Sequence, residues 1–199
     1  MLTLRLLLLS GPARSGKNVA GAAIGNKYGA DHFALSDQLK IDTHAYYGLG
    51  SELSAMHFED RKDTACLEFS GLTPRQAYID YSENYLKPRF GSGQLGELAV
   101  PRVRRNIEEG RLSILSGVGF FDEVRPIVET ALSENCLHLI VVGAAKTNAA
   151  IYDSRERLNL NALGVPSFEI KNDRTKSFID DVCAIIGNFE AARQNFPQA

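Results

Sequence analysis

The sequence has no tryptophan, only three cysteines and no obvious membrane-spanning apolar run. Cys66, Cys136 and Cys183 are odd in number and form no C-x-x-C pair, which argues against a zinc site and favours reduced thiols. The apolar run Leu6–Leu9 follows Arg5 and is too short for a signal peptide or a membrane span. We therefore expect a cytoplasmic protein with no membrane partner.

The chain also lacks a strong charge of either sign. Its 22 basic and 24 acidic residues give a formal net charge of -2, so no overall basic field favours a nucleic-acid partner. The four histidines do not have the spacing of a metal site, and neither a G-x-S-x-G nor a Cys/His nucleophile pattern occurs. With 199 residues, 44% of them hydrophobic, the sequence predicts a single globular domain over residues 1–199.

What the chain does have is a glycine-rich segment between an apolar run and a helical pattern. Gly11, Gly16 and Lys17 form the pattern G-x-x-x-x-G-K. The glycines let backbone N–H groups approach phosphate oxygens, and the helix that begins near Gly16 points its positive dipole end at the same anion. The point charge of Lys17 would reach the outer phosphates of a triphosphate. The sequence predicts nucleotide binding through Gly11, Ala13, Arg14, Ser15, Gly16, Lys17, Asn18 and Val19.

Asn18 stands where a serine or threonine, whose hydroxyl binds Mg²⁺, usually follows the lysine. An amide oxygen can also ligate a hard cation, directly or through water. We therefore expect ATP and Mg²⁺ as cofactors, with Asn18 as a weak metal ligand.

Apolar runs and helical patterns alternate after this segment. Strands are predicted at residues 3–9, 31–35, 112–116, 137–142 and 167–170, and helices at 16–28, 36–47, 73–87, 95–109, 123–135, 153–163 and 175–189. The alternation predicts an α/β fold of the P-loop NTPase type: three α/β/α layers with a mostly parallel, doubly wound sheet whose ligand binds at the C-terminal strand ends. Residues 48–71 are mixed and polar and are predicted to form a loop or a flexible arm.

Phosphate transfer between two anionic groups needs several cations that converge on the reacting oxygens. Outside the glycine-rich segment the sequence offers Arg75, Lys87, Arg89, Arg155 and Arg157. Arg75 opens a predicted helix, and the last two arginines follow a central strand, where lids attach. The alternative for each is a solvated surface charge. We prefer that alternative for Arg102, Arg104 and Arg105, which fit an exposed helix face.

Six short motifs occur in order along nearly the whole chain: Gly11–Lys17, Thr73–Ala77, Lys87–Gly91, Gly119-Phe120 with Glu123, Asp153–Arg155, and Asn172-Asp173. This succession resembles the phage-encoded deoxynucleoside monophosphate kinases and their adenylate-kinase-like relatives. The resemblance implies transfer of the γ-phosphate of ATP to a (deoxy)nucleoside monophosphate. It also implies that residues 48–110 form a helical acceptor-binding insertion and residues 144–160 a lid.

The resemblance implies a role for each matching residue. Lys17 and Arg14 would hold the ATP phosphates, and Arg75, with Lys87 or Arg89, the phosphate of the acceptor. The remaining implied assignments are lid arginines at Arg155 and Arg157, a turn near the adenine at Asn172 and Asp173, and a carboxylate near the acceptor at Asp37. Such a protein would act on small nucleotides, in the host cytoplasm if phage-encoded, and a homodimer is left open.

Together with Asn18, three metal or phosphate positions depart from the pattern of these kinases. Gly117 stands where relatives often carry an aspartate that organises Mg²⁺, and the segment Val142–Lys146 lacks an expected arginine. Asp37 and Asp122 remain as carboxylates near the site. Two alternatives therefore stay open: a catalytically degenerate nucleotide-binding protein, and a P-loop kinase of another small phosphate acceptor.

Overall fold

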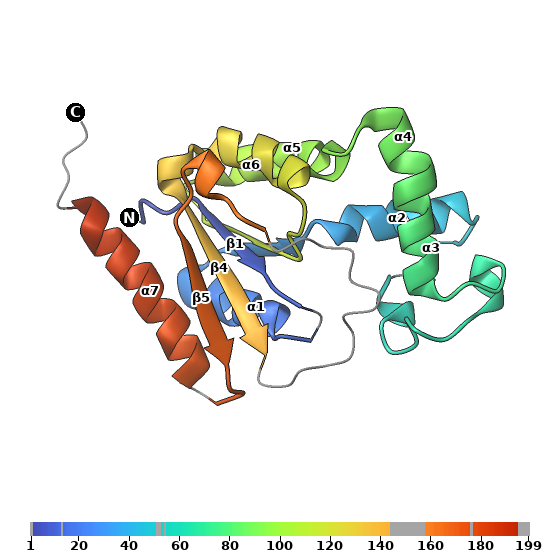
Figure 1. The fold of residues 1–199 in the computed structure, drawn as a ribbon, viewed down its shortest axis with the longest axis horizontal. Helices are drawn as coiled ribbons and strands as arrows, with labels where there is room; N and C mark the ends of the chain where they lie inside the picture. The colour runs from blue at the N-terminus through green and yellow to red at the C-terminus, as the bar shows by residue number, and fades with distance from the viewer. Residues whose placement is uncertain are drawn as a thin grey trace.

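The computed structural model describes residues 2–12, 14–50, 53, 55–143, 158–175 and 177–194. In these residues one parallel sheet has the strand order β2-β3-β1-β4-β5 (Figure 1). Its strands are β1 (Leu6–Ser10), β2 (Asp31–Ala34), β3 (Ser113–Ser116), β4 (Cys136–Gly143) and β5 (Ser167–Asn172). The α/β fold expected from the sequence is confirmed, and every pairing in this sheet is parallel.

The central strand β1 is buried on both faces, because helices cover both sides of the sheet. Consecutive strand residues point to opposite faces. Leu6 and Leu8 pack with α5 (Gln94–Glu108) and α6 (Phe121–Ala131). Leu7 and Leu9 pack with α1 (Lys17–Tyr28) and α7 (Ser177–Gln194), so the leucine run fills two separate hydrophobic clusters.

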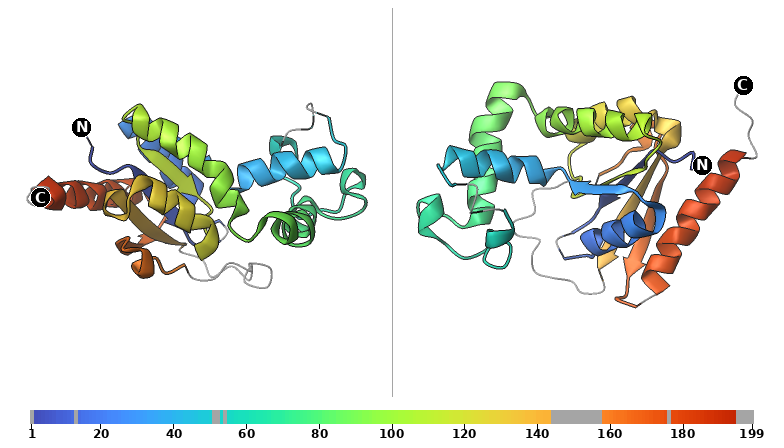
Figure 2. Two further views of the ribbon diagram at one scale, coloured as in Figure 1. Left: turned by 90° about the horizontal axis from the view of Figure 1, so that it is seen from above. Right: turned by 180° about the vertical axis from the view of Figure 1, so that it is seen from behind.

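The helical arm is the part that projects from one end of this three-layer body (Figure 2). It contains α2 (Ser36–Tyr46), α3 (Pro74–Tyr81), a π-helical turn (Ser82–Leu86) and α4 (Lys87–Phe90). Part of the interval 48–110 that the sequence assigned to an insertion, α5, lies instead on the sheet and packs against α6.

Residues 48–71 differ from the expected loop in their described part. Two 3₁₀ turns, Ala55–Phe58 and Leu67–Phe69, place Phe58 and Phe69 in a fully buried cluster. The His44 ring contacts both, at centroid distances of 5.2 and 5.5 Å. The aromatic packing gives this segment a small core of its own.

Several helix boundaries also differ from the expected ones. The helix from Pro74 does not stop before Pro88, because the π-helical turn joins α3 directly to α4. Pro101 lies inside α5 without ending it. Of the helix expected at 153–163, residues 153–157 lie outside the described part, and Asn161–Leu163 is a 3₁₀ turn.

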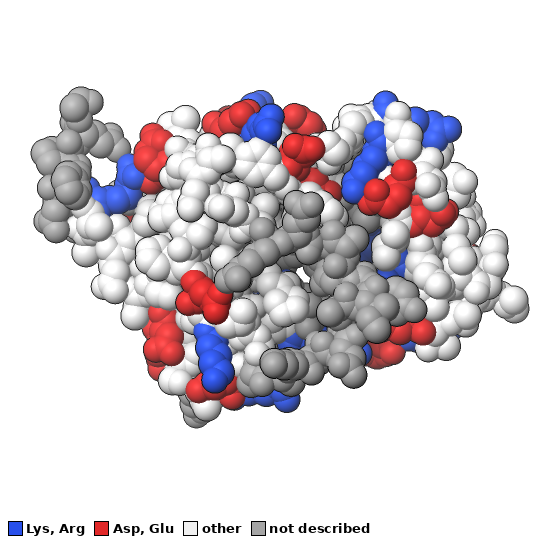
Figure 3. Space-filling view, in the orientation of Figure 1, with Lys and Arg blue, Asp and Glu red and all other residues white. Residues whose placement is uncertain are grey.

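In the described part of the chain, no helix has the length and apolarity needed to span a bilayer. On the face drawn in Figure 3, basic and acidic side chains lie next to one another over both the body and the arm.

Candidate functional site

The segment between β1 and α1 has backbone geometry that requires glycine. Gly11 has φ 131° and Gly16 has φ 98°, both in the region that side chains disfavour. A Cβ at Gly11 would lie 2.1 Å from the carbonyl oxygen of Val141, and one at Gly16 would lie 2.0 Å from Nδ2 of Asn172. The ends of β4 and β5 therefore press directly against the loop.

Lys17 closes this loop from inside. Its side chain is buried, and its Nζ donates to the carbonyl oxygens of Gly11 at 2.7 Å and Pro12 at 2.6 Å. A third contact, at 3.4 Å, joins it to Oγ of Ser15. The ammonium thus lies at the centre of the ring of loop atoms, next to the first turn of α1.

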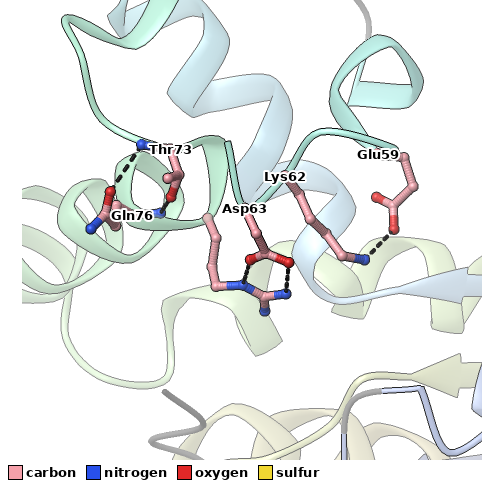
Figure 4. Close-up of polar contacts among 6 residues, drawn as sticks. Glu59, Lys62, Asp63, Thr73 and Gln76 are labelled. Carbon is pink, nitrogen blue, oxygen red and sulfur yellow. Dashed lines mark hydrogen bonds and ion pairs between the residues drawn. The ribbon is translucent and has the colours of Figure 1, made fainter. Parts of the chain in front are cut away.

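The two helix N-termini near the site differ in how their donors are used. Gly16 precedes α1, and no side chain in the described residues caps this end. Thr73 and Gln76 form a capping box on α3 (Figure 4), with bonds of 2.9 and 3.1 Å. Pro74 has no N–H, and the N–H of Arg75 donates to the carbonyl oxygen of Lys62. The α1 terminus is therefore suited to an anion, whereas the donors of α3 are already used.

One cavity of about 580 Å³ connects the loop with the arm. The basic side chains among its described lining residues are Arg14, Lys17, Lys40, Lys62 and Arg75, and the acidic ones are Asp37, Glu59, Glu83 and Glu123. Leu39, Phe58, Tyr78, Leu95 and Phe120 are prominent among the apolar and aromatic residues of its wall. The cavity wall therefore combines basic and acidic side chains from the loop and the arm with apolar and aromatic residues.

The structure brings some of the expected residues to this cavity. Those that line it are Arg14, Gly16, Lys17, Asn18, Val19, Asp37 and Arg75. Gly11 and Ser15 shape the loop beside it. Ala13, Arg155 and Arg157, and with them most of the expected lid, lie outside the described residues.

Lys87 and Arg89 are not among the described residues that line the cavity. Lys87 pairs with Glu83 at 2.5 Å and lies over the ring of Phe120, and Arg89 lies over the ring of Tyr85. Lys87 follows Arg75 by 12 residues on one continuous helical stretch, which corresponds to about 18 Å along the axis. This separation keeps Lys87 and Arg89 away from Arg75.

Asn172 and Asp173 stabilise the backbone around the loop. Asn172 donates from Nδ2 to the carbonyl oxygen of Ser15 at 2.8 Å, and its Oδ1 accepts the N–H of Arg174. Asp173 accepts bonds from the N–H and the hydroxyl of Thr175, which lower the pKa of its carboxyl. Their assignment to the adenine stays a prediction.

The sequence did not predict a hydrogen-bonded pair of His44 and Tyr78, of which Tyr78 lines the cavity. His44 must donate from Nδ1 to the carbonyl oxygen of Leu53, because a carbonyl only accepts. Its Nε2 then accepts from the hydroxyl of Tyr78 at 3.0 Å. Burial lowers the pKa of His44 and raises the pKa of Tyr78 to about 12, so both stay neutral. Their spacing of 34 residues gives no local signal.

The described lining of the cavity includes four carboxylates, those of Asp37, Glu59, Glu83 and Glu123. No group of three or more His, Cys, Asp or Glu in the described part of the chain is arranged to hold a metal ion. Asn18 and Asp37 are exposed at the cavity, and Glu123 is buried beside it. This donor set fits a Mg²⁺ that arrives with phosphates and keeps most of its water, rather than an ion held by protein alone.

No family of known proteins matches the chain, and no curated protein matches it. Solved structures do. A sugar kinase from Janibacter sp. has 11% identity and a TM-score of 0.50, covering 95% of this chain and 97% of its own. A candidate kinase from Chloroflexus aurantiacus has 10% identity and a TM-score of 0.52, covering 98% of both chains. Dephospho-CoA kinase from Campylobacter jejuni has 11% identity and a TM-score of 0.45, covering 95% and 99%.

At these identities the similarity shows the fold alone. The chain has a P-loop NTPase-like three-layer architecture, a fold that is found in proteins described as kinases. The nature of the reaction must be argued from the site.

Proposed function

We propose that this protein is a kinase that transfers the γ-phosphate of ATP to a (deoxy)nucleoside monophosphate. The observation that carries the proposal is one cavity whose lining includes both Lys17, in the first turn of α1, and Arg75, in the first turn of α3. Phosphoryl transfer needs two anions held end to end by cations, and this lining offers a basic side chain for each.

The donor would bind at the loop between β1 and α1. The first-turn N–H groups of α1 and the Lys17 ammonium suit the β- and γ-phosphates. Because the ammonium already donates to Gly11 and Pro12, a phosphate oxygen would replace one of these carbonyl acceptors. Mg²⁺, when bound, would neutralise phosphate charge, with Asn18 and bridging water as its contacts from this loop.

The acceptor would lie in the arm half of the cavity, with its phosphate beside Arg75. One of its phosphate oxygens attacks the γ-phosphorus, a new P–O bond forms, and the bond to the bridging oxygen of ADP breaks. The attacking phosphate oxygen already carries negative charge, so the protein need not remove a proton from it. Tyr78 offers aromatic surface for a nucleobase.

A second candidate acceptor is a hydroxyl compound, and Asp37 favours it. This carboxylate is exposed at the cavity, just after β2, and its Oδ2 accepts the N–H of Ala34 at 2.9 Å. A carboxylate in this place could accept the proton of an attacking hydroxyl group. The third candidate is nucleotide binding without turnover, which Gly117 favours because it offers no carboxylate at the end of β3.

The deciding experiment measures ADP release from Mg²⁺-ATP with a panel of ribo- and deoxyribonucleoside monophosphates. We expect turnover with one or a few of them. Turnover only with sugars or other hydroxyl compounds would move the assignment to the second candidate. ATP binding without turnover, with the monophosphates and with the hydroxyl compounds alike, would support the third candidate, nucleotide binding alone.

Replacing Arg75 by glutamine is expected to raise KM for the monophosphate by about tenfold or more, because a charge-assisted hydrogen bond to the acceptor is lost. The KM for ATP should stay within about twofold of its original value. Steady-state kinetics with each substrate varied in turn makes the measurement. The control is Arg104→Gln, an equal charge change on the exposed side of α5. Equal effects on both KM values would remove Arg75 from the acceptor site.

A further inference from the structure

The turn at residues 59–63, between the two 3₁₀ turns of the arm, holds two carboxylates and a lysine close to Arg75. Lys62 pairs with Glu59 at 2.7 Å, and Arg75 pairs with Asp63 through Nε at 2.6 Å (Figure 4). Lys40, on α2, approaches the same Glu59 at 3.8 Å. Lys62, Arg75, Lys40 and Glu59 line the cavity, so these ion pairs form part of its wall.

The fields of these groups overlap. The hydrogen bond from Lys62, with the charges of Lys40 and Arg75, lowers the pKa of Glu59. The bond from Arg75, with the charges of Lys62 and Arg14, lowers the pKa of Asp63. Each carboxylate therefore lies in the field of basic side chains both from the turn and from another element.

An anion at this place would depend on side chains. The first donors of α3 are used by its capping box and by the carbonyl oxygen of Lys62, so no backbone N–H there faces the cavity unbonded. The bond from Arg75 N–H to Lys62 O, at 3.1 Å, also fixes the turn against the helix. Lys62 and Arg75 are thereby held together as one unit.

We propose that Lys62 and Arg75 together bind the phosphate of the acceptor, and that Glu59 and Asp63 are counterions which this phosphate displaces. The proposal rests on the function proposed above, and it assigns to the acceptor phosphate a lysine that the sequence left in a polar loop. The ligand chemistry is a phosphate monoester dianion, whose two charges match one lysine and one arginine. Lys40 and Arg14 supply additional positive field from α2 and the loop.

The exchange of partners is energetically feasible because the resident pairs are weak. The carboxylates of Glu59 and Asp63 are about half exposed, at 51% and 55%. Exposed ion pairs of this kind contribute little, whereas a dianion offers more charge and more acceptor oxygens to the same cations. In the absence of acceptor, Glu59 and Asp63 keep the cations from repelling one another.

The test measures binding by titration calorimetry to protein saturated with Mg²⁺ and a non-hydrolysable ATP analogue, so that the loop at Lys17 is filled. The probes are inorganic phosphate, the four deoxynucleoside 5′-monophosphates and the corresponding nucleosides. The variants are Lys62→Gln and Asp63→Asn, with Arg61→Gln as the matched control. Arg61 lies in the same turn, pairs with Glu68 at 2.9 Å and is not among the described lining residues.

We expect Lys62→Gln to weaken monophosphate binding by about tenfold, because it removes a charge-assisted contact. Asp63→Asn should strengthen it by about threefold, because the carboxylate of Asp63 no longer competes with the phosphate for Arg75. Arg61→Gln should change it by less than about twofold, and none of the three should alter nucleoside binding. Thermal unfolding curves of the three variants check that they remain folded.

The proposal is overturned if Lys62→Gln and Arg61→Gln weaken binding equally, if Asp63→Asn weakens it, or if no phosphate probe binds. If a further variant, Lys87→Gln, weakens monophosphate binding and Lys62→Gln does not, the acceptor phosphate belongs to Lys87, as the sequence resemblance implied. The outcome is separate from that of the proposed function. Phosphate binding with the expected pattern but no turnover refutes only the kinase, and turnover without the pattern refutes only this site.

Discussion

Replacing Lys17 by methionine is expected to lower kcat by about a thousandfold and to weaken ATP binding by at least about tenfold. Lys17 is the cation at the centre of the loop, and a preorganised charge aimed at the transferring phosphate contributes effects of this size. Methionine keeps most of the length of the buried stem and removes the ammonium. Initial-rate kinetics and calorimetric titration with ATP provide the two measurements.

The matched control is Lys27→Met, at the other end of α1, where the side chain is exposed. This change removes the same charge from the same helix and should leave both quantities within about twofold. Circular dichroism and thermal unfolding show whether each variant keeps the fold. Unchanged ATP affinity in a folded Lys17→Met protein would refute nucleotide binding at this loop.

The free energy of unfolding is expected to fall by about 3 kcal/mol between pH 6.5 and pH 4 because of His138 alone. This side chain is fully buried in β4 between Oγ of Ser10, at 2.7 Å, and Oγ of Ser167, at 2.9 Å. Burial lowers the pKa of His138 from 6.5 to about 4. Between these two values the unfolded chain binds a proton and the native protein does not, so acid favours unfolding.

The contribution of His138 can be separated with the variant His138→Gln, compared with the parent protein by urea unfolding at several pH values. His32 and His44 also have a lowered pKa and add to the acid slope of both proteins, but they cancel in the difference. The stability advantage of the parent should shrink by about 3 kcal/mol as the pH falls to 4. A constant difference would contradict the prediction.

The sheet could be predicted from the sequence because each of its strands is indicated by a local pattern of residues. The apolar runs that became β1 and β4 are continuous, and the glycines around Lys17 stand directly after the first of them. Errors at the strand ends were small. The packing of buried strands depends on hydrophobicity more than on any particular partner, so it can be read without knowing the partners.

The arm could not be predicted in the same way, because its core uses single residues far apart in the chain. Phe58 and Phe69 stand in polar surroundings without a period, and their contacts reach to His44 and Tyr78. No local pattern in the sequence pairs Arg75 with Asp63 either, because the two stand 12 residues apart. A segment whose stability comes from tertiary contacts has no amphipathic pattern to detect.

Arg75 was predicted from the sequence to bind a phosphate, but for a reason that the structure does not support. Its position at a helix start suggested help from the helix dipole, whereas the donors of that helix are used within the protein. Arg102, expected on an exposed helix face, instead forms a bidentate pair with Asp31, which lowers the pKa of Asp31 to about 2. In both cases the charge was visible in the sequence and its partner was not.

The π-helical turn between α3 and α4 makes the length of the chain a determinant of the arm surface. Such a turn contains one residue more than a regular α-helical turn. Deleting a single residue from Ser82–Leu86 would restore a regular helix and rotate everything beyond it by about 100° around the axis. A relative with one residue fewer in this turn would present other side chains beside Phe120, even if every neighbouring amino acid were the same. Divergence in acceptor preference could then arise by a change of length and escape a comparison of substitutions.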